Sequence, residues 1–382
     1  MITEYFGWDI TTSIVMRPCF IDKNNRQNRG MRMDSIIELN VGTDFDISVL
    51  RSIIEMNEKS DEVKVTEVYG SLRSEYIDMP SARPDFRLSD SDRANFEEYI
   101  KIADSNGIGI NYTANASFNS SIDEYASKKE EISDVFKYLE SVGVNSVIIA
   151  NPLLVEIVTE CTGLKIKIST IQGINKPSAI KHYAKGHVNK ICADIYTNRN
   201  IPLLKAMQDE ANKYNIEIEL LANEICLYGD APCSSILRSS CYTHSSMGGN
   251  KDKLFNNWPF ERCQRARQEY PICWLKIPYI LPQYLKFYKE HTGIHNFKIT
   301  GRTNTHEYLL RTLKAYMDME YTGSIPELFM LPQNISNNDV LIYTEELEEM
   351  GFFDNLLNNK QCDYRCEECG FCEGYWKKLN MK

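Results

Sequence analysis

The sequence predicts an α/β protein of the (β/α)8 class, a TIM barrel, with a long cysteine-rich loop after strand 7 and a cysteine-rich C-terminal tail. From about residue 34, short β-type runs alternate with amphipathic helical stretches, and this alternation implies a parallel sheet. Eight such units can be counted, which favours a closed barrel over an open sheet. We therefore expect an N-terminal segment at 1–33, the barrel at 34–320 and the tail at 321–382.

The expected strands are short runs rich in apolar and β-branched residues. Between them, apolar residues recur three and four positions apart, as in Ile132, Phe136 and Leu139, which is typical of a helix with one buried face. A last helix from His306 to about Met319 would close the barrel. The strands are expected at Ser35–Val41, Val63–Tyr69, Gly107–Thr113, Ser146–Ala150, Lys165–Thr170, Lys190–Ile195, Ile216–Ala222 and Phe297–Thr300.

Composition narrows the function classes. The first residues carry no basic region of the kind that opens a signal peptide, and no apolar run reaches the roughly 18 residues that a membrane span needs. We therefore expect a soluble, cytoplasmic protein without a membrane partner. The net charge is −10, and no basic face stands out, so nucleic acid is a less favoured partner.

Twelve cysteines are the clearest compositional signal. In a reducing cytosol, cysteines are more often metal ligands or catalytic groups than disulfides. One group falls in the expected loop between Asn223 and Tyr279, after the seventh strand, where barrel enzymes build their active sites. Soft thiolates suit zinc or an iron–sulfur cluster, and structural zinc or buried free cysteines stay open as alternatives. The candidate ligands in this loop are Cys226, Cys233, Cys241, Cys263 and Cys273.

A second cysteine group lies in the tail, as Cys362-x3-Cys366-x2-Cys369-x2-Cys372. Its close spacing would let one loop wrap a metal centre. The last part resembles bacterial ferredoxin spacing, and a four-cysteine zinc site is the alternative. We expect two metal centres, because the clustered cysteines exceed the ligands of one four-ligand site.

A third feature is the run from Lys298 to Arg302, followed by a helix that carries Glu307. An arginine at the end of the last strand can direct its guanidinium at a carboxylate or phosphate of an anionic small molecule or peptide. The structural alternative is that Arg302 pairs with an acidic residue inside the barrel, such as Glu38, Glu67 or Glu307.

Catalysis by hydrolysis has little support in the sequence. No common protease motif is present, and His244, beside Ser245 and Cys241, is the only suggestive group.

These motifs resemble the collagenase-like family numbered thirty-two among peptidases of unknown catalytic type. Lys298, Gly301 and Arg302, with Glu307-Tyr308 and Tyr316, match its "KIEGR…EY…Y" signature, and Cys226-x6-Cys233 matches its paired-cysteine motif. Weaker similarities fall in the third, fourth and fifth strands. The resemblance covers about residues 34 to 320.

The resemblance implies a barrel that holds a four-iron four-sulfur cluster through four cysteines, here from Cys226, Cys233, Cys263 and Cys273. It also implies modification chemistry under anaerobic conditions, because relatives hydroxylate ubiquinone precursors or RNA without molecular oxygen. Of the candidate catalytic residues, Arg302, Lys298 and Glu307 belong to the motif that carries the resemblance, while His244 is a candidate from the residues alone. The alternatives are a peptidase, or a non-catalytic cluster-carrying subunit with a homologous partner barrel.

Several positions depart from the family pattern. Ala222-Asn223 stands where the family has His-Gly, and Ile195-Tyr196 stands where it has Arg-Glu. Cys263 and Cys273 are more widely spaced than usual. These departures leave the substrate and one cluster ligand undefined.

Replacing either Cys226 or Cys233 by alanine should abolish the main cluster and destabilise the barrel mouth, because water cannot replace a thiolate without changing cluster occupancy. Iron content and visible absorbance of the anaerobically purified variants measure this effect. Wild-type values in both variants would show that the ligand assignment is wrong.

Overall fold

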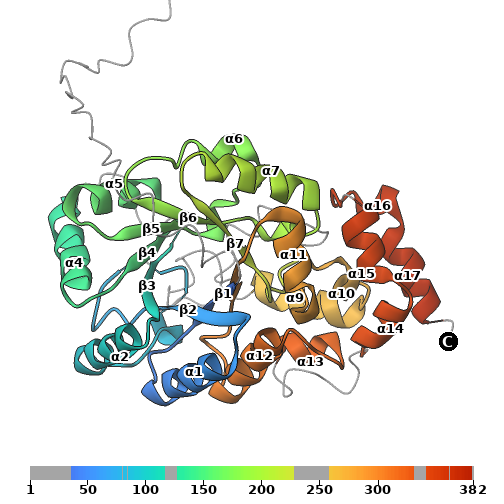
Figure 1. Cartoon of the computed structure of the whole chain (residues 1–382), viewed down its shortest axis with the longest axis horizontal. Helices are drawn as coiled ribbons and strands as arrows, with labels where there is room; N and C mark the ends of the chain where they lie inside the picture. The colour runs from blue at the N-terminus through green and yellow to red at the C-terminus, as the bar shows by residue number, and fades with distance from the viewer. Residues whose placement is uncertain are drawn as a thin grey trace, which may run out of the picture. The chain divides into compact units, whose positions relative to one another are not determined.

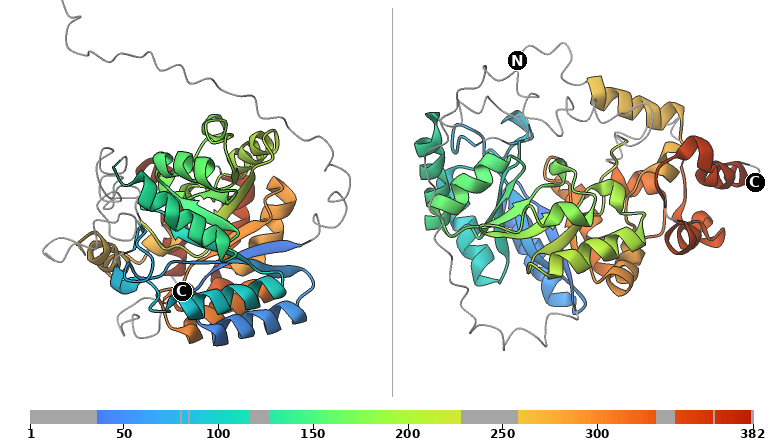
Figure 2. Two further views of the ribbon diagram at one scale, coloured as in Figure 1. Left: turned by 90° about the vertical axis from the view of Figure 1, so that its left-hand side faces the viewer. Right: turned by 90° about the horizontal axis from the view of Figure 1, so that it is seen from above.

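The computed structural model describes residues 36–382 except 80, 84, 117–126, 228–257, 331–340, 361, 381 and 382. Eight parallel strands form a closed barrel in chain order, from β1 through β8 and back to β1. The helices lie outside the ring of strands (Figures 1 and 2). The predicted (β/α)8 class is therefore confirmed.

The strands are β1 (Ile37–Gly42), β2 (Val63–Gly70), β3 (Gly109–Ala114), β4 (Ser146–Ile149), β5 (Lys165–Ile168), β6 (Val188–Cys192), β7 (Glu217–Leu221) and β8 (Asn296–Ile299). The helices of the barrel region are α1 (Ile47–Lys59), α2 (Arg93–Ser105), α4 (Lys129–Ser141), α5 (Pro152–Cys161), α6 (Pro177–Ile180), α7 (Ile201–Asn212), α9 (Trp258–Glu269), α10 (Cys273–Lys276), α11 (Leu285–Thr292) and α12 (His306–Asp318). The tail adds α13 (Ile325–Phe329), α14 (Thr344–Glu349), α15 (Phe352–Asp354), α16 (Cys366–Cys369) and α17 (Phe371–Leu379).

Each predicted strand is present, and the closing helix begins at His306 as expected. The sixth strand ends at Cys192 and not at Ile195. The reason is local, because the Asp194 side chain accepts a hydrogen bond from the backbone N–H of Tyr196 and starts a short 3-10 helix. Part of the expected long loop after β7 is helical, as α9 and α10. No helix among the described residues is long and apolar enough to cross a bilayer.

The tail and the barrel belong to one compact unit, which spans residues 36–382. One apolar core lies between the strands and the barrel helices. A second core joins α9 and α10 to the tail through residues such as Trp274, Leu275, Phe329 and Phe352. The tail therefore packs against the segment that follows β7 (Figure 1).

The barrel interior is polar and contains paired charges. On β5, the Lys167 ammonium binds the carboxylates of Glu67 and Glu219. On β6, Lys190 binds Glu67 at 3.2 Å and donates to the Asn296 side chain at 2.7 Å. Hydrogen bonds extend this network until it contains one residue from every strand: Asn40, Glu67, Asn111, Ser146, Lys167, Lys190, Glu219 and Asn296.

The network sets the charge state of its members. Burial alone would raise the pKa of Glu219, but Lys167, Lys298 and Lys190 outweigh burial and lower this pKa to about 2. Burial likewise opposes ionisation of Glu67, and Lys167 and Lys190 still hold its pKa below the ordinary value. Both carboxylates are therefore ionised at neutral pH.

Glu219→Gln should lower the free energy of unfolding by about 3–5 kcal/mol, because it removes one partner from a buried ion pair. Asp209→Asn, which removes the exposed Lys205–Asp209 pair on α7, is the control and should cost less than about 0.5 kcal/mol. Urea unfolding at neutral pH measures both values. Equal effects of the two changes would show that the interior network contributes no stability.

The stability difference between wild type and Glu219→Gln should also depend on pH. Because the folded-state pKa of Glu219 lies below its ordinary value of 4.5, the stabilisation is present above that value and is lost as the pH falls toward about 2. Unfolding curves across this range test the sign. A difference that grows on acidification would contradict it.

Candidate functional site

A cavity of about 500 Å³ opens at the carboxyl ends of the strands, which is the face where barrel enzymes carry their active sites. Among the described residues, its lining contains five basic residues and one acidic residue, Glu224, although the whole protein has a net charge of −10. The excess of positive charge favours an anionic ligand. The basic residues are Arg83, Arg87, Arg267, Lys298 and Arg302.

Backbone geometry after β8 places Arg302 at this mouth. Gly301 has a φ of +144°, a conformation that is essentially restricted to glycine, and a Cβ there would lie 3.0 Å from Leu309. The Asn223 side chain accepts from the N–H of Thr300 at 2.7 Å and donates to the carbonyl of Thr300 at 2.9 Å. The ends of β7 and β8 are thereby joined just before Arg302.

The Arg302 side chain is half-buried and reaches across the mouth to β3. Its Nη1 donates to Thr113 Oγ1 at 2.6 Å and to Ser71 Oγ at 3.4 Å, and its guanidinium carbon lies 5.8 Å from the centre of the Tyr69 ring. Desolvation lowers the pKa of Arg302 to about 10, so the group stays charged at neutral pH. Neutral hydroxyls hold one side of the guanidinium and supply no counter-charge.

The predicted alternative of an ion pair inside the barrel is wrong for Arg302. Glu67 pairs with Lys167 and Lys190, and Glu38 accepts from the Thr66 hydroxyl. Glu307 is exposed in the first turn of α12 and does not line the cavity. At this position its negative charge stabilises the N-terminus of α12.

Lys298 lies beside Arg302 at the end of β8. The side chain is buried, and its Nζ is 3.9 Å from the centre of the Tyr69 ring, a cation–π contact. Desolvation lowers the pKa of Lys298, against the opposing charges of Glu219 and Cys192. Within the described part of the chain its ammonium forms no hydrogen bond, so its donors remain for a ligand in the cavity.

The same cavity carries cysteines of the first group. Cys226 and Cys263 line it, and Cys273 is buried at the start of α10. Cys233, Cys241 and His244 lie outside the described residues. Among those described, no three cysteine, histidine, aspartate or glutamate side chains form a ready group of metal ligands.

Arg267 on α9 indicates what these cysteines could hold. Its buried side chain is under the electrostatic influence of Cys263, Cys226 and Cys273. Nη1 donates to the carbonyl of Ile225 at 3.1 Å, and Nε is buried without an acceptor. Glu224 also acts on this side chain, but within the described residues it forms no ion pair with Arg267, and burying a cation with so little counter-charge is costly. A thiolate-bound iron–sulfur cluster carries negative charge and would supply it, so the residues present fit such a group.

Comparisons with known proteins support the sequence resemblance. The family model described as "Peptidase family U32" matches residues 67–254, from β2 into the segment after β7. Over the residues that it matches, this model supports the resemblance seen in the sequence. A curated relative, "Uncharacterized protease MJ1657" of Methanocaldococcus jannaschii, is 25% identical over 245 residues, which cover 63% of this chain and 67% of the relative.

Among solved structures, the U32 peptidase Mk0906 is similar with a TM-score of 0.43 and 12% identity. The match covers 75% of this chain and 96% of that one.

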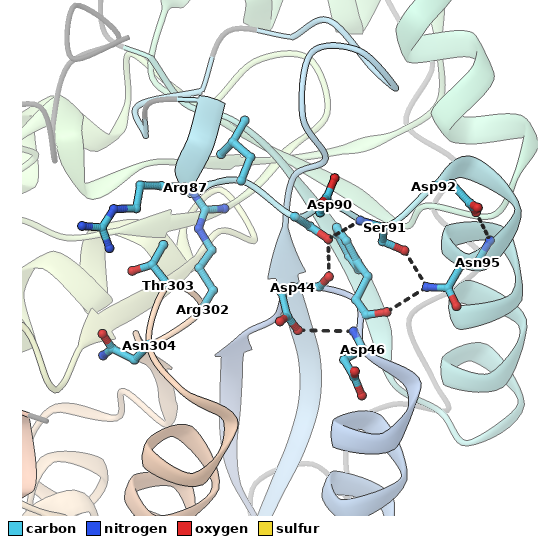
Figure 3. A pocket seen from close by; sticks show the side chains of 13 residues that line it. Asp44, Asp46, Arg87, Asp90, Ser91, Asp92, Asn95, Arg302, Thr303 and Asn304 are labelled. Carbon is cyan, nitrogen blue, oxygen red and sulfur yellow. Dashed lines mark hydrogen bonds between the residues drawn. The ribbon is translucent and has the colours of Figure 1, made fainter.

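A second cavity of about 800 Å³ adjoins the first and shares Arg87, Arg302, Thr303 and Asn304 with it. Figure 3 shows the two arginines on one side and aspartates, including Asp44, on the other. Here His306 Nε2 lies 2.7 Å from Asp44 Oδ2, and this bond raises the pKa of His306. Arg302 therefore lies at the boundary between an acidic and a basic cavity of the barrel.

The sequence did not reveal several residues of this site. Thr113, Ser71 and Tyr69 meet Arg302 only because the barrel closes, and no local motif indicates that contact. Arg267 follows Cys263 by four residues on α9, so a charged residue one helical turn from a candidate ligand was the available signal.

The tail cysteines Cys362, Cys366, Cys369 and Cys372 line a separate small cavity.

Gly301→Ala should destabilise the barrel by about 2 kcal/mol or more, because alanine strains the backbone at this φ and its Cβ would crowd Leu309. The matched control is Gly374→Ala, where a Cβ in α17 would meet nothing within 4 Å and the protein should gain roughly 0.5–1 kcal/mol. Urea unfolding of both variants measures this. A neutral Gly301→Ala variant would show that the strand end tolerates other conformations.

Proposed function

We propose that this chain is an enzyme that binds an anionic substrate at the barrel mouth and modifies it beside a thiolate-bound iron–sulfur cluster. The observation that carries the proposal is the five-to-one excess of basic residues in a cavity that also contains Cys226 and Cys263. Cys226, Cys263, Cys273 and a fourth cysteine, Cys233 or Cys241, would hold the cluster. The substrate class is a carboxylate- or phosphate-bearing small molecule or peptide.

Arg302 and Lys298 would bind the anionic group of the substrate. The planar guanidinium can present two parallel donors to a carboxylate, and contacts with Thr113 and Ser71 fix its orientation in advance. Lys298 adds a point charge whose position is fixed by Tyr69. The half-buried setting strengthens these attractions, because the effective dielectric constant is lower than in bulk water.

The remaining polar lining would position the reacting part of the substrate. Ser169, Thr170 and Asn115 line the cavity on the β3 and β5 sides and can donate or accept hydrogen bonds. When bound, the cluster would supply electron transfer, or Lewis-acid chemistry if one iron lacks a protein ligand. Oxygen-independent hydroxylation is the modification that the family resemblance favours.

Proteolysis is the second candidate function, because the curated relative carries the name protease. It requires a nucleophile with an adjacent base, or a hydrolytic metal site. Of the residues described as lining the cavity, none is a histidine and Glu224 is the single carboxylate. This composition supports anion binding better than peptide hydrolysis.

Arg302→Lys should keep the fold and any cluster but weaken binding of an anionic ligand by about 1.5–3 kcal/mol, the range for charge-assisted hydrogen bonds. Calorimetric titration with a panel of di- and tricarboxylates and phosphate esters measures the affinity. Melting temperatures of the same variants measure their stability. Lys314→Arg, at an exposed position on α12, is the control. A large loss of melting temperature with unchanged affinity would assign Arg302 a structural role.

Peptide hydrolysis is tested in the same preparations by incubating anaerobically purified protein with casein and identifying fragments by mass spectrometry. The proposal predicts no cleavage. Cleavage that is lost in Arg302→Lys would establish the peptidase and overturn the proposed modification.

A further inference from the structure

The tail folds so that four cysteines share one cavity. Cys366 and Cys369 stand at the two ends of the single turn α16, and Gly370 has a φ of +61°, which reverses the chain at once into α17. Cys372 then falls in the first turn of α17, while Cys362 precedes α16. All four line the same small cavity.

The tail segment that forms this cavity packs against residues of the barrel region. Cys372 Sγ donates to the carbonyl of Leu275 at 3.4 Å, and Lys276 pairs with Glu373 at 3.0 Å. The Phe371 and Tyr375 rings both contact Phe352. The tail cysteines are therefore held beside α10.

A buried arginine faces the tail cysteines. Arg199 is only 2% exposed and lines the cavity. Its Nη1 and Nη2 donate to the carbonyls of Leu275 and Ile277, while Nε is buried without an acceptor. Throughout the described part of the chain, no carboxylate forms an ion pair with it.

The other charges of the cavity do not neutralise Arg199. Asp363 pairs with Arg365 at 2.7 Å, and Glu373 pairs with Lys276. Lys360 also lines the cavity and is hydrogen-bonded to Cys369. Two cations thus face four thiols, and a buried cation without a counter-charge is unfavourable by several kcal/mol.

We propose that Cys362, Cys366, Cys369 and Cys372 hold a second metal centre, a tetrathiolate site whose negative charge is balanced by Arg199 and Lys360. Zinc or a four-iron four-sulfur cluster bound by four thiolates carries a net charge of about −2, which matches two cations. The four cysteines line the cavity but, among the described residues, do not yet form a group of metal ligands, so binding draws their thiols together. The site lies outside residues 67–254 and does not depend on the proposed function.

The test uses the full chain, purified without oxygen and assayed for zinc, iron and acid-labile sulfide. Cys366→Ser/Cys369→Ser should lose one metal centre and keep the metal that Cys226→Ala loses. Loss of zinc with unchanged sulfide would identify a zinc site. Loss of iron and sulfide in equal amounts would identify a cluster. Cys161→Ser, a part-buried cysteine outside both groups, should lose nothing. Wild-type metal content in the double variant would overturn the proposal.

A titration keeps the proposal testable if the double variant folds poorly. In full-length Cys226→Ala protein freed of metal, Co²⁺ should give the absorbance of a tetrahedral tetrathiolate site, and Cys362→Ser should abolish it. Absence of that spectrum in Cys226→Ala would overturn the site.

Arg199→Met should weaken Co²⁺ binding at this site roughly tenfold, as outer-shell changes do. Arg365→Met, which removes an exposed arginine near the same cysteines, is the control. Equal affinities in the two variants would overturn the role of Arg199.

Discussion

The ion-paired network inside the barrel is the constraint on which the rest of the structure depends. It takes one side chain from each of the eight strands, and Lys167 and Lys190 each connect strands that are not neighbours. Slipping a strand by one residue would turn its charged side chain away from the interior and leave the partners buried without a counter-charge. The network therefore fixes the strand register, and through the register it fixes which residues reach the mouth.

The positions of the residues at the barrel mouth depend on this strand register. Glu219 belongs to the network and its charge also acts on Lys298, so the interior charges influence the cation of the site. Arg302 contacts strand β3 and the residue that follows β2 across the barrel. Beyond the strands, α10 lies between the two cysteine groups, because it contains Cys273 and its Leu275 carbonyl accepts from Cys372 and Arg199.

The sequence predicted what local patterns encode. Eight alternating units defined the barrel, and the Gly-Arg pair after the last strand defined the position of Arg302. The charged interior was not predicted, because Lys167 and Glu219 alternate with apolar residues, and such alternation equally indicates a strand with one solvent-facing side. Glu307 was placed in the site by its motif, yet its position on α12 leaves it exposed. Arg199 and Arg267 resemble surface arginines until tertiary packing buries them.

The central claim is that thiolates at the mouth of a cationic barrel hold an iron–sulfur cluster. Its most direct measurement is an ultraviolet–visible spectrum, with iron and acid-labile sulfide assays, of the full chain purified without oxygen. The account predicts broad absorbance near 400 nm, with iron and sulfide in equal amounts of about four each per cluster. Zinc with no sulfide, or protein free of any metal, would contradict it.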